Sequence, residues 1–262
     1  MAAGPPPPKE INLSAGQVGC FLIHGFTGTP DDLTDLATFL ADNNYRTSAP
    51  LLAGHGATIE ECNLVRAADW LDETEFHFAE FFLGVETAFV LGVNMGAALA
   101  LHLASLYPVA GVVAVSPRLD PGSPGLRWRL ALMAPLTGTV SRERAHNVGP
   151  NRQPSPYGNG VYPLQALRAM LTLNRHVRAE LPAVTAPTLV MQARNGGSDP
   201  SKHARRLLDA ISSDQKSFLS YPADGHALPG WAQGGRARAQ LLAFLHRHTP
   251  AATRALPVHQ SR

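Results

Sequence analysis

The stretch LGVNMGAALA, from Leu91 to Ala100, decides the fold class of this chain. Here the strand-like run TAFVLGV meets the helix-like run MGAALALHLA, and the two join through a Gly-x-Asn-x-Gly turn. A short apolar run favours a buried strand, and the small and aliphatic residues after the turn favour a closely packed helix. A buried strand that passes directly into a buried helix is typical of α/β proteins. The turn presents one polar side chain, that of Asn94.

Length and composition indicate one sizeable core and exclude several classes of protein. The chain has 262 residues, of which 45% are hydrophobic, as expected for a globular α/β domain. It has no run of about eighteen or more apolar residues, so no transmembrane span is expected. The sequence MAAGPPPPKE at the start lacks the features of a secretory signal. Two cysteines, Cys20 and Cys62, make no disulfide framework, and we expect a cytoplasmic protein.

The net charge of +2 indicates neither a nucleic-acid partner nor a membrane partner. The charge is nevertheless uneven, because residues 118–178 hold nine arginines and two acids. That segment therefore carries +7 and the rest of the chain −5. The arginines form either a solvated face or a binding surface for an anionic ligand or an acidic carrier protein. The oligomeric state has no signal in the sequence.

Strand-like and helix-like segments alternate along most of the chain, which indicates a parallel sheet covered on both faces. Predicted strands cover residues 18–23, 46–50, 87–93, 111–116, 188–193 and 216–221. Predicted helices cover residues 30–44, 65–83, 95–107, 202–211 and 232–246. We expect an α/β fold with a mostly parallel six-stranded sheet flanked by helices.

The alternation is interrupted once, between residues 117 and 186. This segment is rich in proline and glycine, with helical patterns near 126–136 and 163–181, and such long insertions often form lids. We expect a flexible N-terminus over residues 1–16, one domain over 17–248 with a lid at about 117–186, and a flexible tail over 249–262.

Five short motifs occur in an order and spacing that cover almost the whole chain. They are His24-Gly25-Phe26, Gly54-His55-Gly56, the turn from Gly92 to Gly96, VMQAR at 190–194, and Gly225-His226. With these motifs the chain resembles the α/β-hydrolase superfamily, and in particular the bacterial carboxylesterase and monoacylglycerol lipase group. The resemblance implies an α/β-hydrolase fold from about residue 17 to 248.

The resemblance also implies roles for individual residues. In this superfamily a nucleophile sits on the sharp strand-to-helix turn, and two backbone N–H groups form an oxyanion hole. On this chain the nucleophile position falls on Asn94, and the oxyanion-hole donors would be Phe26 and Met95. The general base would be His226.

Two positions depart from the family pattern. A carboxamide at Asn94 has no ionisable proton at neutral pH, so a histidine cannot activate it as a nucleophile. The acid that orients the base would fall near Gly196, where this chain has no carboxylate. Asp199 is the nearest substitute after that strand, and Asp120 is a weaker one. Two of three triad members are therefore altered, while His226 remains.

Several residues have both a structural and a functional interpretation. Asn94 either tolerates an unusual backbone conformation or donates its amide to a ligand. His24 and His55 are expected to shape their loops, and Cys62 has no base motif beside it. The other histidines considered show no metal-ligand spacing, so neither a metal nor a cofactor is expected; they are His77, His102, His176, His246 and His248.

The expected function is therefore a non-hydrolytic one. The protein would act on a small, apolar, carbonyl-bearing molecule by acid/base and oxyanion-hole chemistry of the lyase, cyclase or isomerase type, without an acyl-enzyme. Asn94 would orient the ligand, and His226, oriented by Asp199, would transfer a proton. One alternative is a catalytically inactive ligand-binding or scaffold protein, and a second is a weak carboxylesterase or lipase.

Overall fold

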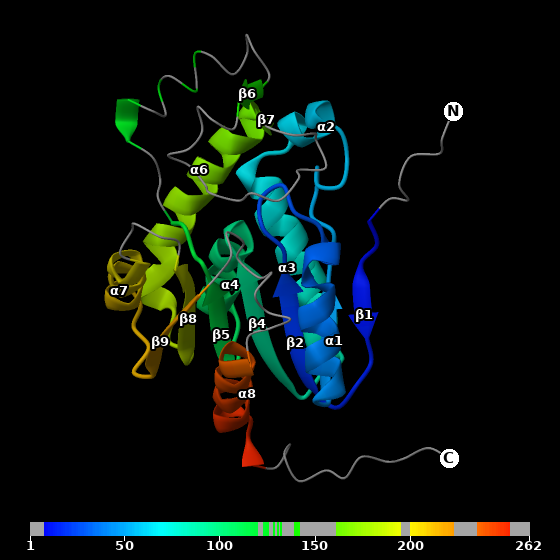
Figure 1. Cartoon of the computed structure of the whole chain (residues 1–262). Coiled ribbons are helices and arrows are strands. Elements are labelled where there is room, and N and C mark those ends of the chain that lie inside the picture. Colours follow the sequence, from blue (N-terminus) through cyan, green and yellow to red (C-terminus); the bar gives the residue numbers. More distant parts are fainter. Residues whose placement is uncertain are drawn as a thin grey trace.

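Seven strands form one central sheet in the order β1-β3-β2-β4-β5-β8-β9 (Figure 1). This computed structural model describes residues 8–119, 123–125, 128, 130, 132, 139–141, 161–194, 200–222 and 235–251. The strands of the sheet are β1 (Ile11–Leu13), β2 (Val18–Ile23), β3 (Tyr45–Ala49), β4 (Thr87–Val93), β5 (Gly111–Val115), β8 (Thr188–Arg194) and β9 (Lys216–Pro222).

All six predicted strands are present and run parallel to one another. The seventh strand, β1, was not predicted; it pairs antiparallel with β3, so that Ile11 lies opposite Ala49. It is a three-residue edge strand around Asn12, too short for a clear alternation of apolar residues. Three residues of the segment 1–16, which was expected to be flexible, thus form an edge strand of the sheet.

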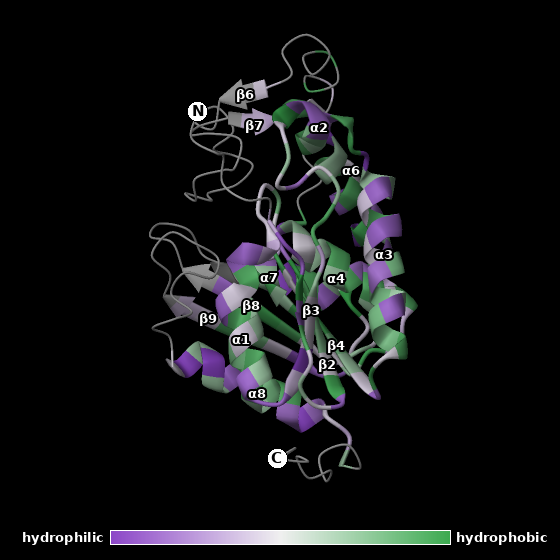
Figure 2. Cartoon of the chain, turned by 90° about the vertical axis from the view of Figure 1, so that its right-hand side faces the viewer, coloured by the Kyte–Doolittle hydropathy of each residue, from purple (hydrophilic) through white to green (hydrophobic). Residues whose placement is uncertain are grey.

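Helices cover both faces of the sheet, as expected. They are η1 (Pro30–Leu33), α1 (Thr34–Asp42), α2 (Ile59–Leu64), α3 (Ala67–Leu83), α4 (Met95–Leu106), α6 (Leu164–Glu180), η2 (Leu181–Ala183), α7 (Pro200–Ala210) and α8 (Gly235–His248). Figure 2 shows α1 and α8 on one side of the strands and α3 on the other. Successive strand residues alternate between two apolar cores, so that Phe21 packs with α3 and α4 while Leu22 packs with α1 and α8.

The helix predicted over residues 65–83 corresponds to α3, and the short helix α2, which was not predicted, precedes it. Thr58 caps α2, because its hydroxyl accepts a hydrogen bond from the Glu61 N–H at 3.2 Å. The chain is extended at Val65 and Arg66, and the Asp69 carboxylate then accepts the Arg66 N–H at 2.8 Å to start α3. These caps and the extended residues between them separate α2 from α3.

The insertion between β5 and β8 contributes a second, two-stranded sheet and a long helix. Strand β6 (Thr139–Ser141) pairs antiparallel with β7 (Val161–Pro163), and α6 follows directly. In Figure 1 this pair lies with α2 at the end of the molecule opposite α8. The helix predicted at 163–181 corresponds to α6, whereas the pattern at 126–136 falls largely outside the described residues.

Two further expectations concern the cysteines and the membrane. Cys20 and Cys62 are both buried free thiols. Among the described residues, no helix combines the length and the apolar character that crossing a membrane requires.

Candidate functional site

The turn between β4 and α4 holds Asn94 in a backbone conformation that few side-chain-bearing residues adopt. Its φ is 55° and its ψ is −107°. The turn is tight enough that a Cβ on Gly92 would lie 1.9 Å from the Gly96 carbonyl oxygen, and a Cβ on Gly96 2.2 Å from that of Ile23. Glycine is therefore required at both positions. The Asn94 N–H donates to the Val115 carbonyl at 2.9 Å, which fixes the turn against β5.

The Asn94 side chain is available to a ligand. It is partly exposed, and it makes no hydrogen bond with any residue that the structure describes. An amide in this position can donate through Nδ2 and accept through Oδ1. The structure thus places a neutral, bifunctional hydrogen-bonding group at the tip of the turn.

The two predicted oxyanion-hole residues flank this amide. Met95 is the first residue of α4, so its N–H has no acceptor within the helix. Phe26 lies in the loop after β2, and its N–H makes no backbone hydrogen bond to another described residue. A Cβ on Gly25 would lie 3.4 Å from the Asn94 Cβ, so this loop runs directly beside the turn. The Phe26 loop and the start of α4 thus lie beside Asn94, while the role of Phe26 and Met95 as oxyanion-hole donors stays a prediction.

Two buried histidines hold the Phe26 loop. The His24 Nε2 accepts a hydrogen bond from the Leu52 N–H at 3.1 Å, which leaves Nδ1 to donate to the Gly25 carbonyl at 3.0 Å. Burial, reinforced by the neighbouring His55, lowers the pKa of His24 to about 3. Burial likewise lowers the pKa of His55 to about 4. Both rings are therefore neutral near pH 7, in agreement with the predicted loop-shaping role.

An aromatic wall connects this loop to the insertion. The Phe26 ring stacks on Tyr162 of β7, with centroids 6.0 Å apart, and meets Trp70 of α3 edge-on at 6.2 Å. The His55 ring packs against Phe26 and Trp70. Phe26, Trp70 and Tyr162 are all buried. The wall is apolar enough to exclude water from one side of the Phe26 loop.

Sequence reasoning missed a polar pair at the neighbouring strand end. Ser116 follows β5 with a φ of 47°, and it shares a hydrogen bond with the Tyr221 side chain of β9. Burial, partly offset by Ser116, raises the pKa of Tyr221 to about 12, so this phenol stays protonated near neutral pH. The two residues lie 105 positions apart, and no local motif joins them.

The predicted acid/base residues lie outside the described part of the chain. His226 and Asp199, together with Gly196 and Asp120, belong to segments whose placement the structure does not describe. Strands β8 and β9 run parallel to β4, and both end at the same edge of the sheet as Asn94. The roles of His226 and Asp199 therefore stay predictions from the resemblance.

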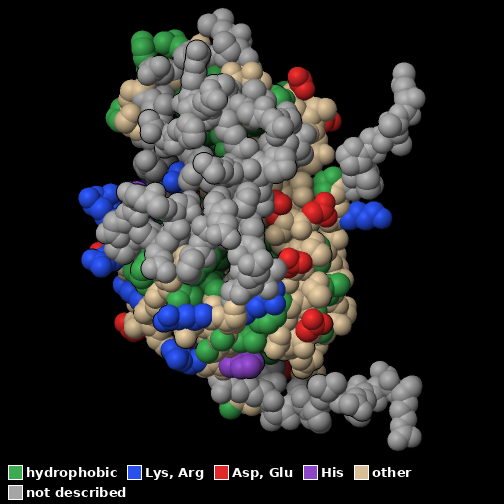
Figure 3. Space-filling model, viewed as in Figure 1, with side chains coloured by type: hydrophobic (Ala, Val, Ile, Leu, Met, Phe, Trp, Pro, Cys, Tyr) green, Lys and Arg blue, Asp and Glu red, His purple; other side chains and the backbone are tan. Residues whose placement is uncertain are grey.

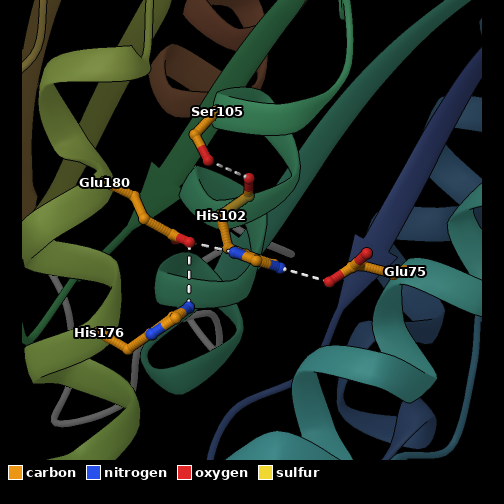
Figure 4. A network of polar contacts seen from close by, with 5 residues as sticks. All are labelled: Glu75, His102, Ser105, His176 and Glu180. Atoms are coloured by element: carbon orange, nitrogen blue, oxygen red, sulfur yellow. Dashed lines mark hydrogen bonds and ion pairs between the residues drawn. The ribbon is translucent and has the colours of Figure 1, made fainter.

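Histidines of α4 and α6, in which the sequence shows no metal-ligand spacing, lie close together in the structure. Figure 4 shows His102, His176 and Glu180 converging on one another, with Glu75 on the far side of the His102 ring. Donor atoms of the first three lie within 4.8 Å of one another. His176 and Glu180 are one helical turn apart, a spacing readable from the sequence, whereas His102 comes from another helix.

Comparison with known proteins agrees with this architecture. A solved structure from the pair LipS and LipT, two metagenome-derived lipolytic enzymes, matches with a TM-score of 0.78 at 24% identity, over 93% of this chain and 99% of that one. A thermostable monoacylglycerol lipase of Bacillus sp. (strain H-257) is 28% identical over 209 residues, which are 78% of this chain and 80% of the relative. A carboxylesterase of Bacillus subtilis (strain 168) is 25% identical over 230 residues, or 84% and 89% of the two chains. The model of the family described as serine aminopeptidase, S33, matches residues 17–230. The chain therefore belongs to this serine aminopeptidase S33 family of the α/β-hydrolase superfamily.

Proposed function

We propose that this protein acts on a small, apolar, carbonyl-bearing molecule by acid/base and oxyanion-hole chemistry, without an acyl-enzyme. The observation that carries the proposal is the Asn94 carboxamide, partly exposed at the tip of the strand-to-helix turn. At neutral pH this group cannot lose a proton to become an attacking oxygen. The surrounding parts, two N–H donors and an apolar wall, still suit a polarised carbonyl.

Binding would begin at the carbonyl oxygen. The Phe26 and Met95 N–H groups would donate to it, the role that the resemblance to the family implies for them. The start of α4 adds the positive end of its helix dipole, which favours negative charge on that oxygen. The Asn94 amide would hold a second polar atom of the ligand, and the wall formed by Phe26, Trp70 and Tyr162 would accept its apolar part.

The chemical step would be a proton transfer by His226. The neutral ring would remove a proton from the carbon next to the carbonyl, while negative charge grows on the oxygen held by the two N–H groups. The protonated ring would then return the proton to another atom of the ligand, or give it to a leaving group. The first outcome is an isomerisation and the second an elimination. Asp199 would orient the ring.

Two alternatives have support of their own. An asparagine tolerates a φ of 55° better than most residues, so Asn94 also suits a catalytically inactive binding or scaffold protein that retains the fold. The names monoacylglycerol lipase and carboxylesterase of the two Bacillus relatives favour a weak hydrolase. An anionic ligand would suit the arginines of the insertion, of which the described ones are all exposed: Arg118, Arg168, Arg175 and Arg178.

Proton abstraction can be measured directly with a simple ketone. In D2O, 2-octanone exchanges its α-hydrogens for deuterium, and proton NMR follows the loss of signal. The wild-type protein is expected to accelerate this exchange, and His226→Ala to lower the enzymatic rate by about 10²–10⁴-fold. Asn94→Ala is expected to weaken ketone binding by about 5- to 10-fold, since one hydrogen bond is lost. His246→Ala is the matched control, because this exposed ring stacks on Tyr45 at the opposite edge of the sheet.

The same proteins separate the three functions. Exchange that depends on His226 supports the proposal, whereas ketone binding without exchange indicates a binding or scaffold protein. A fluorophosphonate probe should not label the wild-type protein. The wild type should also not hydrolyse a 4-nitrophenyl ester. Asn94→Ser supplies the missing hydroxyl and shows that the probe can reach the site. Stoichiometric labelling or multiple ester turnovers by the wild type would overturn the proposal in favour of a hydrolase.

A further inference from the structure

The outer flank of α4 carries a polar cluster that has no part in the proposed function. It consists of Glu75 from α3, His102 from α4, and His176 and Glu180 from α6 (Figure 4). Only 4% of the His102 side chain is exposed, compared with 52% for His176. The cluster thus has a buried centre and a solvent-facing side, through which an ion could enter.

The His102 ring is held between two carboxylates. Its Nε2 lies 3.0 Å from Glu75 Oε1, and its Nδ1 lies 2.8 Å from Glu180 Oε2. A singly protonated imidazole has one N–H, so it can donate to only one of these oxygens. The other ring nitrogen then presents a lone pair to a carboxylate oxygen, an unfavourable contact. Either a second proton or a bound cation is needed at that nitrogen.

Glu180 completes the arrangement with a second histidine. Its other oxygen, Oε1, lies 3.0 Å from His176 Nε2, so the carboxylate bridges the two rings. We propose that His102 Nδ1, His176 Nε2 and the Glu180 carboxylate bind a divalent cation of the zinc class. Two imidazoles and one carboxylate are the ligand types that zinc takes, and a water would fill the fourth position.

Glu75 would support the site from behind. It accepts the His102 Nε2–H, which leaves Nδ1 as the lone pair that faces the ion. A carboxylate that fixes the tautomer of a ligating histidine is the usual second partner of such a metal site.

The adjustment needed to bind zinc is small. The three donor atoms already lie within 4.8 Å of one another, and a tetrahedral zinc site with bonds of about 2.0–2.1 Å sets them roughly 3.3 Å apart. The exposed His176 side chain and the flexible Glu180 side chain can move their donor atoms closer to His102 Nδ1. A bound ion would tie α6 of the insertion to α4 of the main domain.

Titration of the chelator-washed, full-length protein with Zn²⁺ alone tests this site. Wild type is expected to bind one more equivalent than His176→Ala, and its melting temperature should rise with zinc concentration. Glu75→Gln should retain the site but weaken zinc binding by about 10- to 100-fold. His246→Ala is the control for exposed histidines in general, and it should behave like wild type.

Three results would overturn the proposal. Equal zinc stoichiometry in wild type and His176→Ala would show that these residues are not ligands. An equal loss of zinc in His246→Ala would indicate adventitious surface coordination. The protonation of the His102 ring can be followed by nitrogen NMR in excess zinc. Two ring N–H protons under these conditions would show that a proton occupies the proposed metal position. All three are independent of the ketone chemistry, because none of the substituted residues lies at the Asn94 turn.

Discussion

Two ends of the same helix have opposite electrostatic preferences. At the start of α4, the Asn94 turn gathers N–H donors and an amide, beside histidines that burial keeps neutral. Two turns later, His102 lies among carboxylates that accept hydrogen bonds. The first end suits a carbonyl or an anion and the second a cation. One buried helix can therefore support two kinds of site, because its neighbours rather than its own sequence set the chemistry.

The comparison also separates two sources of rigidity. The Asn94 turn is defined by backbone contacts that allow no Cβ at its glycines. The flank of α4 is defined by side-chain contacts, several of them partly exposed to solvent. Substitutions at the turn should therefore lower the free energy of unfolding far more than substitutions at the flank. Substitutions of charged side chains on surfaces away from both regions should change it little. Figure 3 shows such surfaces, with lysine and arginine side chains over the α7 and α8 side and acids over the α1 side.

The largest effect is expected at Gly96. An alanine Cβ there would lie 2.2 Å from the Ile23 carbonyl oxygen and 2.5 Å from that of His24, so the backbone must shift. We expect Gly96→Ala to lower the free energy of unfolding by about 3 kcal/mol or more. Urea denaturation measures this change. The control is Gly235→Ala at the start of α8, where a Cβ meets nothing within 4 Å and the effect should stay below about 1 kcal/mol. Equal effects would refute the backbone argument.

The success of sequence prediction depended on how far the signal extends along the chain. The inner strands β2, β4 and β5 were predictable, because each is a mostly apolar run that is buried along its whole length. Strand β1 was not, since three residues at a sheet edge carry almost no pattern. The long helix that ends at Leu83 was predictable as α3, whereas the six-residue helix α2 before it is too short for a clear apolar periodicity.

For the sites, sequence prediction was limited by which residues the fold brings together from distant parts of the chain. Phe26 and Asn94 could be placed together because family motifs bring the two loops to one edge of the sheet. The His102 cluster could not, because its members come from three helices and become neighbours only through packing. Only His176 and Glu180 have a spacing that the sequence reveals, because they lie four positions apart on α6.

The second-largest effect is expected from acidification, which should lower the free energy of unfolding through the two histidines that hold the Phe26 loop. The unfolded chain protonates His24 and His55 near pH 6.5, whereas their folded pKa values are about 3 and about 4. Their contribution is complete above pH 6.5 and declines as the pH falls below it, because only the unfolded chain then binds the protons. Each ring accounts for up to about 1.4 kcal/mol per pH unit. Urea unfolding at about pH 6.5, 5.5 and 4.5 measures the slope across this window.

Substitution of one ring tests the assignment. His55→Gln should reduce the pH slope by up to about 1.4 kcal/mol per unit, because one buried titrating group is removed. His246→Gln, at an exposed histidine, should leave the slope unchanged. An unchanged slope in His55→Gln would mean that other groups cause the acid sensitivity.

A smaller effect is expected at Asn94 itself. Its φ of 55° disfavours alanine, so Asn94→Ala should lower the free energy of unfolding by about 1 kcal/mol. Asn94→Gly should be at least as stable as wild type, because glycine adopts this backbone without strain. Thermal denaturation of the three proteins gives the order. If glycine were the least stable, the Asn94 side chain would have to make a stabilising contact in the free protein.

The smallest effect is expected at the flank of α4 in metal-free protein. Glu75 is 37% exposed, and the glutamine oxygen of Glu75→Gln can still accept the His102 Nε2–H. Solvent screens the remaining charge effect, so the free energy of unfolding should change by less than about 0.5 kcal/mol. The same substitution should weaken zinc binding strongly, and this divergence between stability and affinity is the informative result. A large loss of stability without metal would mean that the carboxylates hold a protonated His102 as a structural ion pair, and the flank would then match the turn in rigidity rather than contrast with it.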